Sequence, residues 1–152
     1  MEENEYRETY QSINERRCVF EKTINSRRCS CKQSQRFNLA DREGVACKSV
    51  SGNALCTELL DRMRRNARFA LHLTHADRPL PHAREIKVQT GGLLGLQGLL
   101  RPEQAEQENV DNAIGLVDCA IERYGNLAAL PYDVLVQAIV RFEGRTRRPR
   151  RH

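Results

Sequence analysis

Apolar side chains recur every three or four residues over much of this 152-residue chain, which is the period of an amphipathic helix. The first such stripe covers residues 3–24 and is interrupted near its fourth turn by Arg17 and Cys18. A second covers residues 54–73, with Ser51 or Asn53 available to cap its start. The apolar face of this second stripe consists of Leu55, Leu59, Met63, Ala67 and Ala70. Two helices are therefore predicted in the first half of the chain.

The second half shows two further stripes with clear boundaries. Pro102 suits the first position of a helix that Gly125 ends, and Pro131 opens another that Gly144 closes. The side chains that we expect this last helix to bury are Leu135, Val136, Ile139 and Val140. Residues 90–100, TGGLLGLQGLL, carry a glycine at every third position, and on a helix this segment can approach a neighbour closely. The preceding REIKVQ is a weak candidate for a single strand.

Residues 25–50 differ from these stripes, because they show no sustained period and are rich in Ser, Asn, Gln and charge. The pattern indicates a long loop with one helical turn at LADREG. Loops of this length in compact domains are usually functional or disordered, and the cysteines of this one favour a function. The predicted fold is all-α: a four- to five-helix bundle with a long cysteine-rich loop between the first two helices. Residues 1–144 form one helical domain, with a metal-binding loop at about 18–56, and residues 145–152 form an Arg-rich flexible tail.

Composition and charge limit the location and the partners that we expect for this protein. No apolar run approaches the roughly 20 residues that a membrane-spanning helix needs, so no membrane association is expected. The acidic start lacks the apolar stretch of a secretory signal, which predicts a cytoplasmic protein. The net charge of +5 equals the five arginines of the tail, while residues 16–48 are basic and residues 102–122 acidic. The acidic segment suits a protein partner, and the glycine-spaced segment suits a homo-oligomer contact.

Five of the six cysteines lie between positions 18 and 56. In a reducing compartment such a cluster favours metal binding or redox chemistry over structural disulfides. No Cys-x-x-Cys knuckle is present, whereas iron–sulfur clusters accept diverse ligand spacings. The predicted ligands of a [4Fe–4S] cluster are Cys18, Cys29, Cys31 and Cys47, with Cys56 in reserve as a replacement for Cys18.

Three alternatives to the cluster stay open. Four thiolates could instead bind zinc, and the cysteines could also be unliganded thiols at a loop–helix junction. A redox-switch disulfide is the third, because neighbouring arginines should lower the thiol pKa of the Cys-x-Cys pair. The basic side chains that could offset the charge of a cluster or of a zinc–thiolate site are Arg16, Arg17, Arg27, Arg28 and Lys32.

Other chemistry is less well supported by the sequence. His72, His75 and His82 form a minor candidate metal site, and Cys119 is best interpreted as a buried core cysteine. No phosphate loop, nucleophile elbow, zinc-protease or haem motif occurs, so catalysis is not expected. The predicted function is a small metal-binding protein with a redox, sensing or accessory role. The alternative is a zinc-stabilised regulatory or nucleic-acid-binding module that uses the Arg-rich loop and tail.

Overall fold

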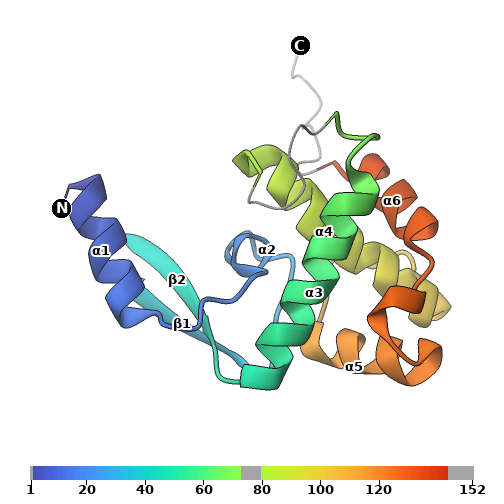
Figure 1. Cartoon of the computed structure of the whole chain (residues 1–152), viewed down its shortest axis with the longest axis horizontal. Coiled ribbons are helices and arrows are strands. Elements are labelled where there is room, and N and C mark those ends of the chain that lie inside the picture. Colours follow the sequence, from blue (N-terminus) through green and yellow to red (C-terminus); the bar gives the residue numbers. More distant parts are fainter. Residues whose placement is uncertain (1, 73–79, 144–152) are drawn as a thin grey trace, which may run out of the picture.

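The computed structural model describes residues 2–72 and 80–143, which form an α+β fold (Figure 1). The helices are α1 (Glu3–Ile13), α2 (Glu21–Asn25), α3 (Val50–Ala67), α4 (His82–Leu100), α5 (Ala113–Tyr124) and α6 (Tyr132–Arg141), with short 3-10 turns η1 (Pro102–Gln104) and η2 (Leu127–Ala129). Strands β1 (Ser34–Leu39) and β2 (Arg42–Cys47) pair as an antiparallel hairpin. No helix in the described part is long and apolar enough to cross a membrane.

The prediction of an all-α four- to five-helix bundle is wrong, because the segment interpreted as a loop contains the β1–β2 hairpin. Leu39 pairs with Arg42, so only Ala40 and Asp41 form the turn. Ala40 has a positive φ of 56°, a position that usually selects glycine or asparagine. The predicted helical turn at LADREG is in fact this hairpin turn. The usual Asn-Gly signal is missing, β1 is mostly polar and β2 does not alternate between polar and apolar residues, so the sequence pattern does not predict these strands.

The single helix expected over residues 3–24 is also wrong, since α1 ends at Ile13 and α2 begins only at Glu21. The chain between them instead runs along the free edge of β2. The backbone N–H of Cys18 donates to the carbonyl of Val45 at 3.0 Å, and the side-chain amide of Asn14 donates to the same carbonyl at 3.0 Å. These bonds to β2 replace the intrahelical bonds that a continuous helix would have made.

The glycine-spaced segment is helical, as predicted, and lies in α4 together with REIKVQ, which is therefore not a strand. α4 approaches α6 closely: a Cβ added to Gly91 would lie 2.8 Å from Cα of Ile139. In α6, Leu135 and Ile139 are buried as expected, but Val140 is 45% exposed. The absence of a side chain at Gly91 therefore lets the backbones of α4 and α6 approach each other closely.

Several predicted boundaries move by a few residues. α3 begins at Val50 and is capped by the hydroxyl of Ser49, which accepts from the N–H of Gly52 at 2.9 Å. Pro102 opens η1 rather than the long helix, which starts at Ala113. Gly125 ends α5 with a φ of 89°, as expected of a C-terminal glycine.

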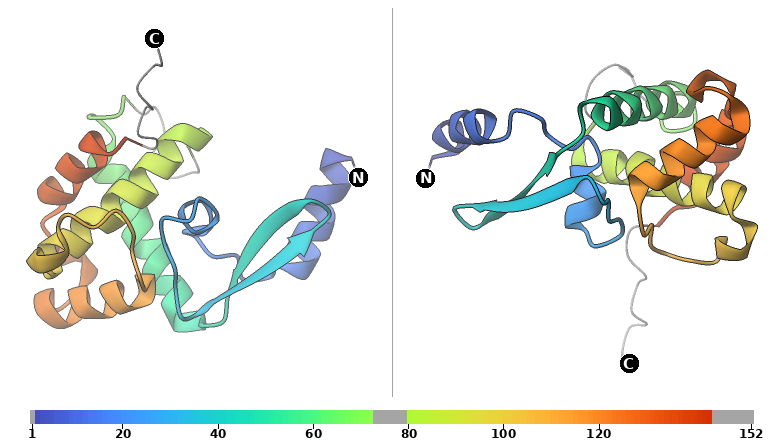
Figure 2. Two further views of the ribbon diagram at one scale, coloured as in Figure 1. Left: turned by 180° about the vertical axis from the view of Figure 1, so that it is seen from behind. Right: turned by 90° about the horizontal axis from the view of Figure 1, so that it is seen from below.

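Two regions can be distinguished in the views of Figures 1 and 2. α1 and the far end of the hairpin extend away from the helical body, while α2 and the near end of the hairpin lie against α3 and α4. We call residues 2–49 the N-terminal lobe and the described residues from 50 onward the helical lobe. The two lobes meet where the cysteines lie.

Candidate metal centre

The five N-terminal cysteines converge at the junction of the two lobes. Cys18 precedes α2, Cys29 and Cys31 precede β1, Cys47 ends β2, and Cys56 lies in the second turn of α3. Cys18, Cys31, Cys47 and Cys56 line one small cavity. Apart from these sulfurs, its walls are largely apolar, with Phe20, Val19, Ala113 and Ile114 among them.

Backbone pairing brings the first three of these cavity thiols together. Cys47 at the end of β2 faces Ser34 of β1 on one side, and on the other side its N–H donates to the carbonyl of Arg16 at 2.8 Å. Cys18 lies on the same side of β2 as Arg16, where its N–H donates to the carbonyl of Val45. The carbonyl of Cys31 accepts from the N–H of Ser34 at 3.1 Å. β2, the segment along its edge and the turn before β1 therefore each contribute one thiol, and α3 supplies the fourth across the lobe boundary.

The Cys-x-Cys segment is held by a part of the chain that is far away in the sequence. Ser30 donates its N–H to the carbonyl of Val110 at 2.9 Å, and its carbonyl accepts from the N–H of Ala113 at 2.9 Å. The N–H of Lys32 donates to the side-chain carbonyl of Asn112 at 3.0 Å. This pairing with the start of α5 is outside the reach of sequence reasoning, because no local pattern marks residues 110–113 as a partner strand.

Cys29, a predicted ligand, and Cys56, the predicted reserve for Cys18, differ in their position relative to the cavity. Cys29 is only 3% exposed, has its sulfur 3.5 Å from the carbonyl of Ser30, and is not among the residues that line the cavity. Cys56, the reserve ligand, does line it. Cys29 nevertheless lies close enough to the cavity thiols for their charges to act on it. The structure therefore gathers all five cysteines, and four of them share the cavity.

Burial dominates the protonation of these thiols. It raises the pKa of Cys18 to about 12 and that of Cys56 to about 12, and it raises the pKa of Cys29 as well. Negative charge on the neighbouring cysteines adds to each increase. For Cys29 the expected lowering of the pKa by nearby arginines is therefore wrong. A protonated thiol is a poor nucleophile, so a reactive redox-switch role at Cys29 is disfavoured.

Several of the arginines in this region are engaged with carboxylates. Arg27 contacts Glu43 at 2.8 Å, Arg17 contacts Glu21 at 2.6 Å, and Arg42 contacts Glu3 at 2.9 Å. Their charge is therefore compensated before it can stabilise a thiolate. Much of the basic patch seen in the sequence is thus neutralised within the N-terminal lobe.

The cavity measures about 20 Å³, room for roughly one water molecule. Within the described residues, no group of three or more His, Cys, Asp or Glu side chains is arranged to hold a metal ion as it stands. Cys18, Cys31 and Cys47 are half-buried rather than fully enclosed. Binding of any metal group therefore requires local movement of these side chains.

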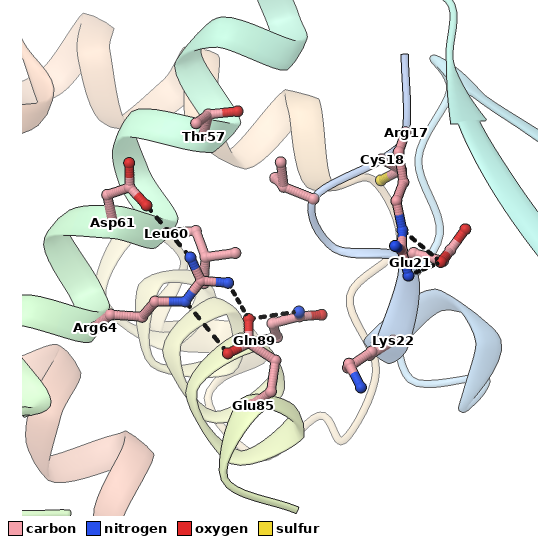
Figure 3. A pocket seen from close by; sticks show the side chains of 11 residues that line it. Arg17, Cys18, Glu21, Lys22, Thr57, Leu60, Asp61, Arg64, Glu85 and Gln89 are labelled. Atoms are coloured by element: carbon pink, nitrogen blue, oxygen red, sulfur yellow. Dashed lines mark hydrogen bonds and ion pairs between the residues drawn. The ribbon is translucent and has the colours of Figure 1, made fainter. Parts of the chain in front are cut away.

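A second, charged pocket of about 270 Å³ adjoins the first through Cys18 and Val19 (Figure 3). On one wall the guanidinium of Arg64 from α3 lies between Asp61 and Glu85, and its Nε donates to Glu85 at 3.2 Å. On the other wall Arg17 pairs with Glu21. Because these charges satisfy one another, the pocket is best understood as a support for the cysteine loop.

Glu21 is the residue in this support that sequence reasoning missed. Its buried carboxylate accepts from the hydroxyl of Tyr10, from the guanidinium of Arg17 and from the N–H of Val45 at 2.7 Å. It thereby fixes α1, β2 and the loop that carries Cys18 to one another. In the sequence it looks like an ordinary acid on the polar face of a helix, and nothing in the local pattern signals its burial.

The remaining candidates among the described residues do not line the cavity. His82 contacts Lys22 at 3.0 Å between Nδ1 and Nζ, His72 is exposed, and His75 lies outside the described residues, as does the Arg-rich tail. Cys119 is half-buried rather than fully buried as expected.

No protein-family model, curated protein or solved structure matches this chain.

Proposed function

We propose that this chain is a small cytoplasmic iron–sulfur protein in which Cys18, Cys31, Cys47 and Cys56 ligate a [4Fe–4S] cluster. One observation carries the proposal: four thiols from four separate segments of the chain line a single cavity. Thiolates are soft ligands that select iron–sulfur clusters, zinc or copper(I). Cysteines that served only as small core residues would have no reason to converge from four segments.

We favour a cluster over a single zinc ion because the sequence contains no Cys-x-x-Cys knuckle, whereas iron–sulfur clusters accept diverse ligand spacings. Either metal group would need the local movement described above, since no described side chains are arranged to hold a metal ion as they stand. The apolar wall also fits, since burial and the surrounding dipoles set the potential of such clusters.

The cluster would connect the two lobes. Three ligands come from the N-terminal lobe and the fourth, Cys56, from α3 of the helical lobe. Electron transfer and oxidation sensing are both consistent with this position, because loss of the cluster would remove one of the connections between the N-terminal lobe and α3. No catalytic residue is needed for either role, and we propose a redox or accessory function rather than an enzymatic one.

Anaerobic purification followed by iron and sulfide analysis and visible spectroscopy tests the proposal. We expect four iron and four sulfide per chain, with broad thiolate-to-iron absorption near about 400 nm. Serine substitution of each of the four cavity cysteines should abolish or strongly reduce the iron content. Cys119→Ser is the matched control, and Cys29→Ser should retain the cluster.

The same measurement can contradict the proposal. A colourless protein with one zinc per chain would favour a zinc-stabilised regulatory or nucleic-acid-binding module. In that case, salt-dependent binding of a short oligonucleotide would be the next observation to make. Absence of both metals would leave the cysteines as unliganded thiols.

A further inference from the structure

The charged pocket that supports the cysteine loop lies between the two lobes, and its two walls carry opposite net charge (Figure 3). Six charged side chains line it, three from each lobe: Arg64, Asp61 and Glu85 from the helical lobe, and Arg17, Lys22 and Glu21 from the N-terminal lobe. The helical wall thus has one carboxylate more than it has cations, and the opposite wall has one cation more than it has carboxylates.

On the helical wall the excess negative charge belongs to Asp61. Both oxygens of Glu85 accept from the guanidinium of Arg64. Glu85 also accepts from the side-chain amide of Gln89 at 3.0 Å and from the N–H of Leu80 at 3.2 Å, so its carboxylate is fully occupied. Among the described residues, the side chain of Asp61 has a single bond, which its Oδ1 accepts from Arg64 at 3.3 Å. The other carboxylate oxygen of Asp61 is therefore available to a ligand.

On the N-terminal wall the excess positive charge belongs to Lys22. The carboxylate of Glu21 is already occupied by Arg17 and by two further donors. Lys22 is half-buried, and its Nζ lies 3.0 Å from Nδ1 of His82. In the part of the chain that the structure describes, no carboxylate lies within ion-pair distance of Lys22, in contrast to Arg17 and Arg64. Lys22 and Asp61 thus line the same pocket from opposite lobes without reaching each other.

We infer that this pocket binds a small zwitterion of the amino acid type, with its ammonium group against Asp61 and its carboxylate against Lys22. An anion alone would be repelled by Asp61 and a cation alone by Lys22, whereas a zwitterion complements both walls. The volume of about 270 Å³ lies just below the roughly 300–1,000 Å³ of sites for drug-sized ligands, so the ligand is a single small molecule. Leu60 and Val19 offer apolar contacts to its hydrocarbon part. The inference does not depend on the proposed cluster.

Isothermal titration calorimetry of the full chain tests the inference with two zwitterionic probes. L-leucine carries its two charges close together, and 6-aminohexanoate carries them at the two ends of a chain. We expect at least one of them to bind, and the one that binds better reports the separation between the walls. The corresponding acid without the amine and the corresponding amine without the carboxylate should each bind at least about tenfold more weakly than that zwitterion.

Two variants assign each wall to one group of the ligand. Lys22→Gln should weaken binding of the zwitterion about tenfold and should not weaken binding of the amine analogue, which has no carboxylate to lose. Asp61→Asn should weaken binding of the zwitterion by a similar factor and should not weaken binding of the acid analogue. The matched controls are Arg65→Gln and Glu122→Gln, which remove one exposed charge outside the pocket and should leave all affinities unchanged.

Three outcomes would overturn the inference. The first is the absence of binding by both zwitterions at millimolar concentration, and the second is an analogue with one charge that binds as tightly as its zwitterion. The third is an equal loss for the zwitterion and both analogues in the Lys22 and Asp61 variants, which would show that these side chains only maintain the shape of the pocket. Iron content is measured separately, so failure of this inference is distinguishable from failure of the proposed function.

Discussion

The two lobes are stabilised by different interactions. Of the buried hydrophobic side chains in the described residues, 5 come from positions 2–49 and 20 come from position 50 onward. The helical lobe is a conventional apolar core. The N-terminal lobe is held instead by hydrogen bonds and ion pairs, by the tilted rings of Tyr6, Tyr10 and Phe37, and by Arg42 stacked 4.4 Å from the centre of the Tyr6 ring.

This difference explains why a metal centre would be useful at the junction. Exposed ion pairs contribute little to stability, generally below about 1 kcal/mol each. A lobe that depends on them is marginal by itself, and a ligand that binds only the folded state stabilises it directly. The comparison thus predicts that the helical lobe is stable without metal and that the N-terminal lobe responds most to metal.

The largest effect is expected in the helical lobe, at its buried ion pair. Arg64→Met leaves the carboxylate of Glu85, which is 1% exposed, without its cation. The cost should be about 3–5 kcal/mol of unfolding free energy, measured by urea denaturation. Arg62→Met, which breaks an exposed pair with Glu58, is the control and should cost under about 1 kcal/mol. Equal losses in both variants would contradict the importance of burial.

A smaller difference in unfolding free energy is expected between alanine substitutions at two glycines of α4. Gly91→Ala should destabilise the protein by about 1–3 kcal/mol, because the new methyl group meets the α6 backbone at Ile139 and that backbone cannot yield easily. At Gly98 the nearest atom to an added Cβ is Cα of Ala105, at an ordinary 3.5 Å. Gly98→Ala should therefore raise the unfolding free energy, by up to about 1 kcal/mol in the same urea titration. Matching changes in the two variants would refute the close α4–α6 approach.

The corresponding test of the N-terminal lobe is Glu21→Gln. The neutral amide keeps the shape of the side chain but weakens its bonds to Tyr10, Arg17 and the N–H of Val45, at a cost of about 1–3 kcal/mol. Hydrogen exchange should show lost protection at β2 and α1 and unchanged protection in α4. If protection falls equally in both lobes, they do not differ in the way described here.

The smallest effect concerns pH and the metal-free form. Burial raises the pKa of Cys56 from its ordinary value of 9.0 to about 12, so the unfolded chain releases this proton first as pH rises. The contribution of this thiol to stability is therefore fully present below pH 9 and is lost as the pH rises toward about 12. Between pH 7 and 10, Cys56→Ser should lose about 1 kcal/mol less stability than the parent in paired denaturation curves. Identical pH dependence would place this thiol in a more polar environment.

The helical lobe was largely predictable because its signals are local. The glycine-spaced helix, the terminal role of Gly125, and the buried faces containing Leu59, Met63 and Ile139 all follow from a period of three to four residues. In the N-terminal lobe the decisive contacts are not local. The hairpin turn contains Ala40 at a positive φ and has no recognisable turn sequence. The first helix ends early because residues 14–18 form hydrogen bonds with β2.

The candidate site shows the same division. The density of cysteines between Cys18 and Cys56 is visible in the sequence, and all five of them do converge in the structure. Spacing alone could not decide between Cys29 and Cys56, because the choice depends on where α3 and the start of α5 place their side chains. The burial of Glu21 and Glu85 is equally invisible in a single sequence.

The bonds between the Cys-x-Cys segment and residues 110–113 have a consequence for biosynthesis. All five clustered cysteines leave the ribosome once Cys56 has emerged, yet the segment that clamps Cys29 and Cys31 is made much later. During that interval the thiols are present without the finished cavity. Assembly of the proposed metal centre would therefore wait until most of the polypeptide has been synthesised, and a nascent chain stalled before Val110 should be unable to complete it.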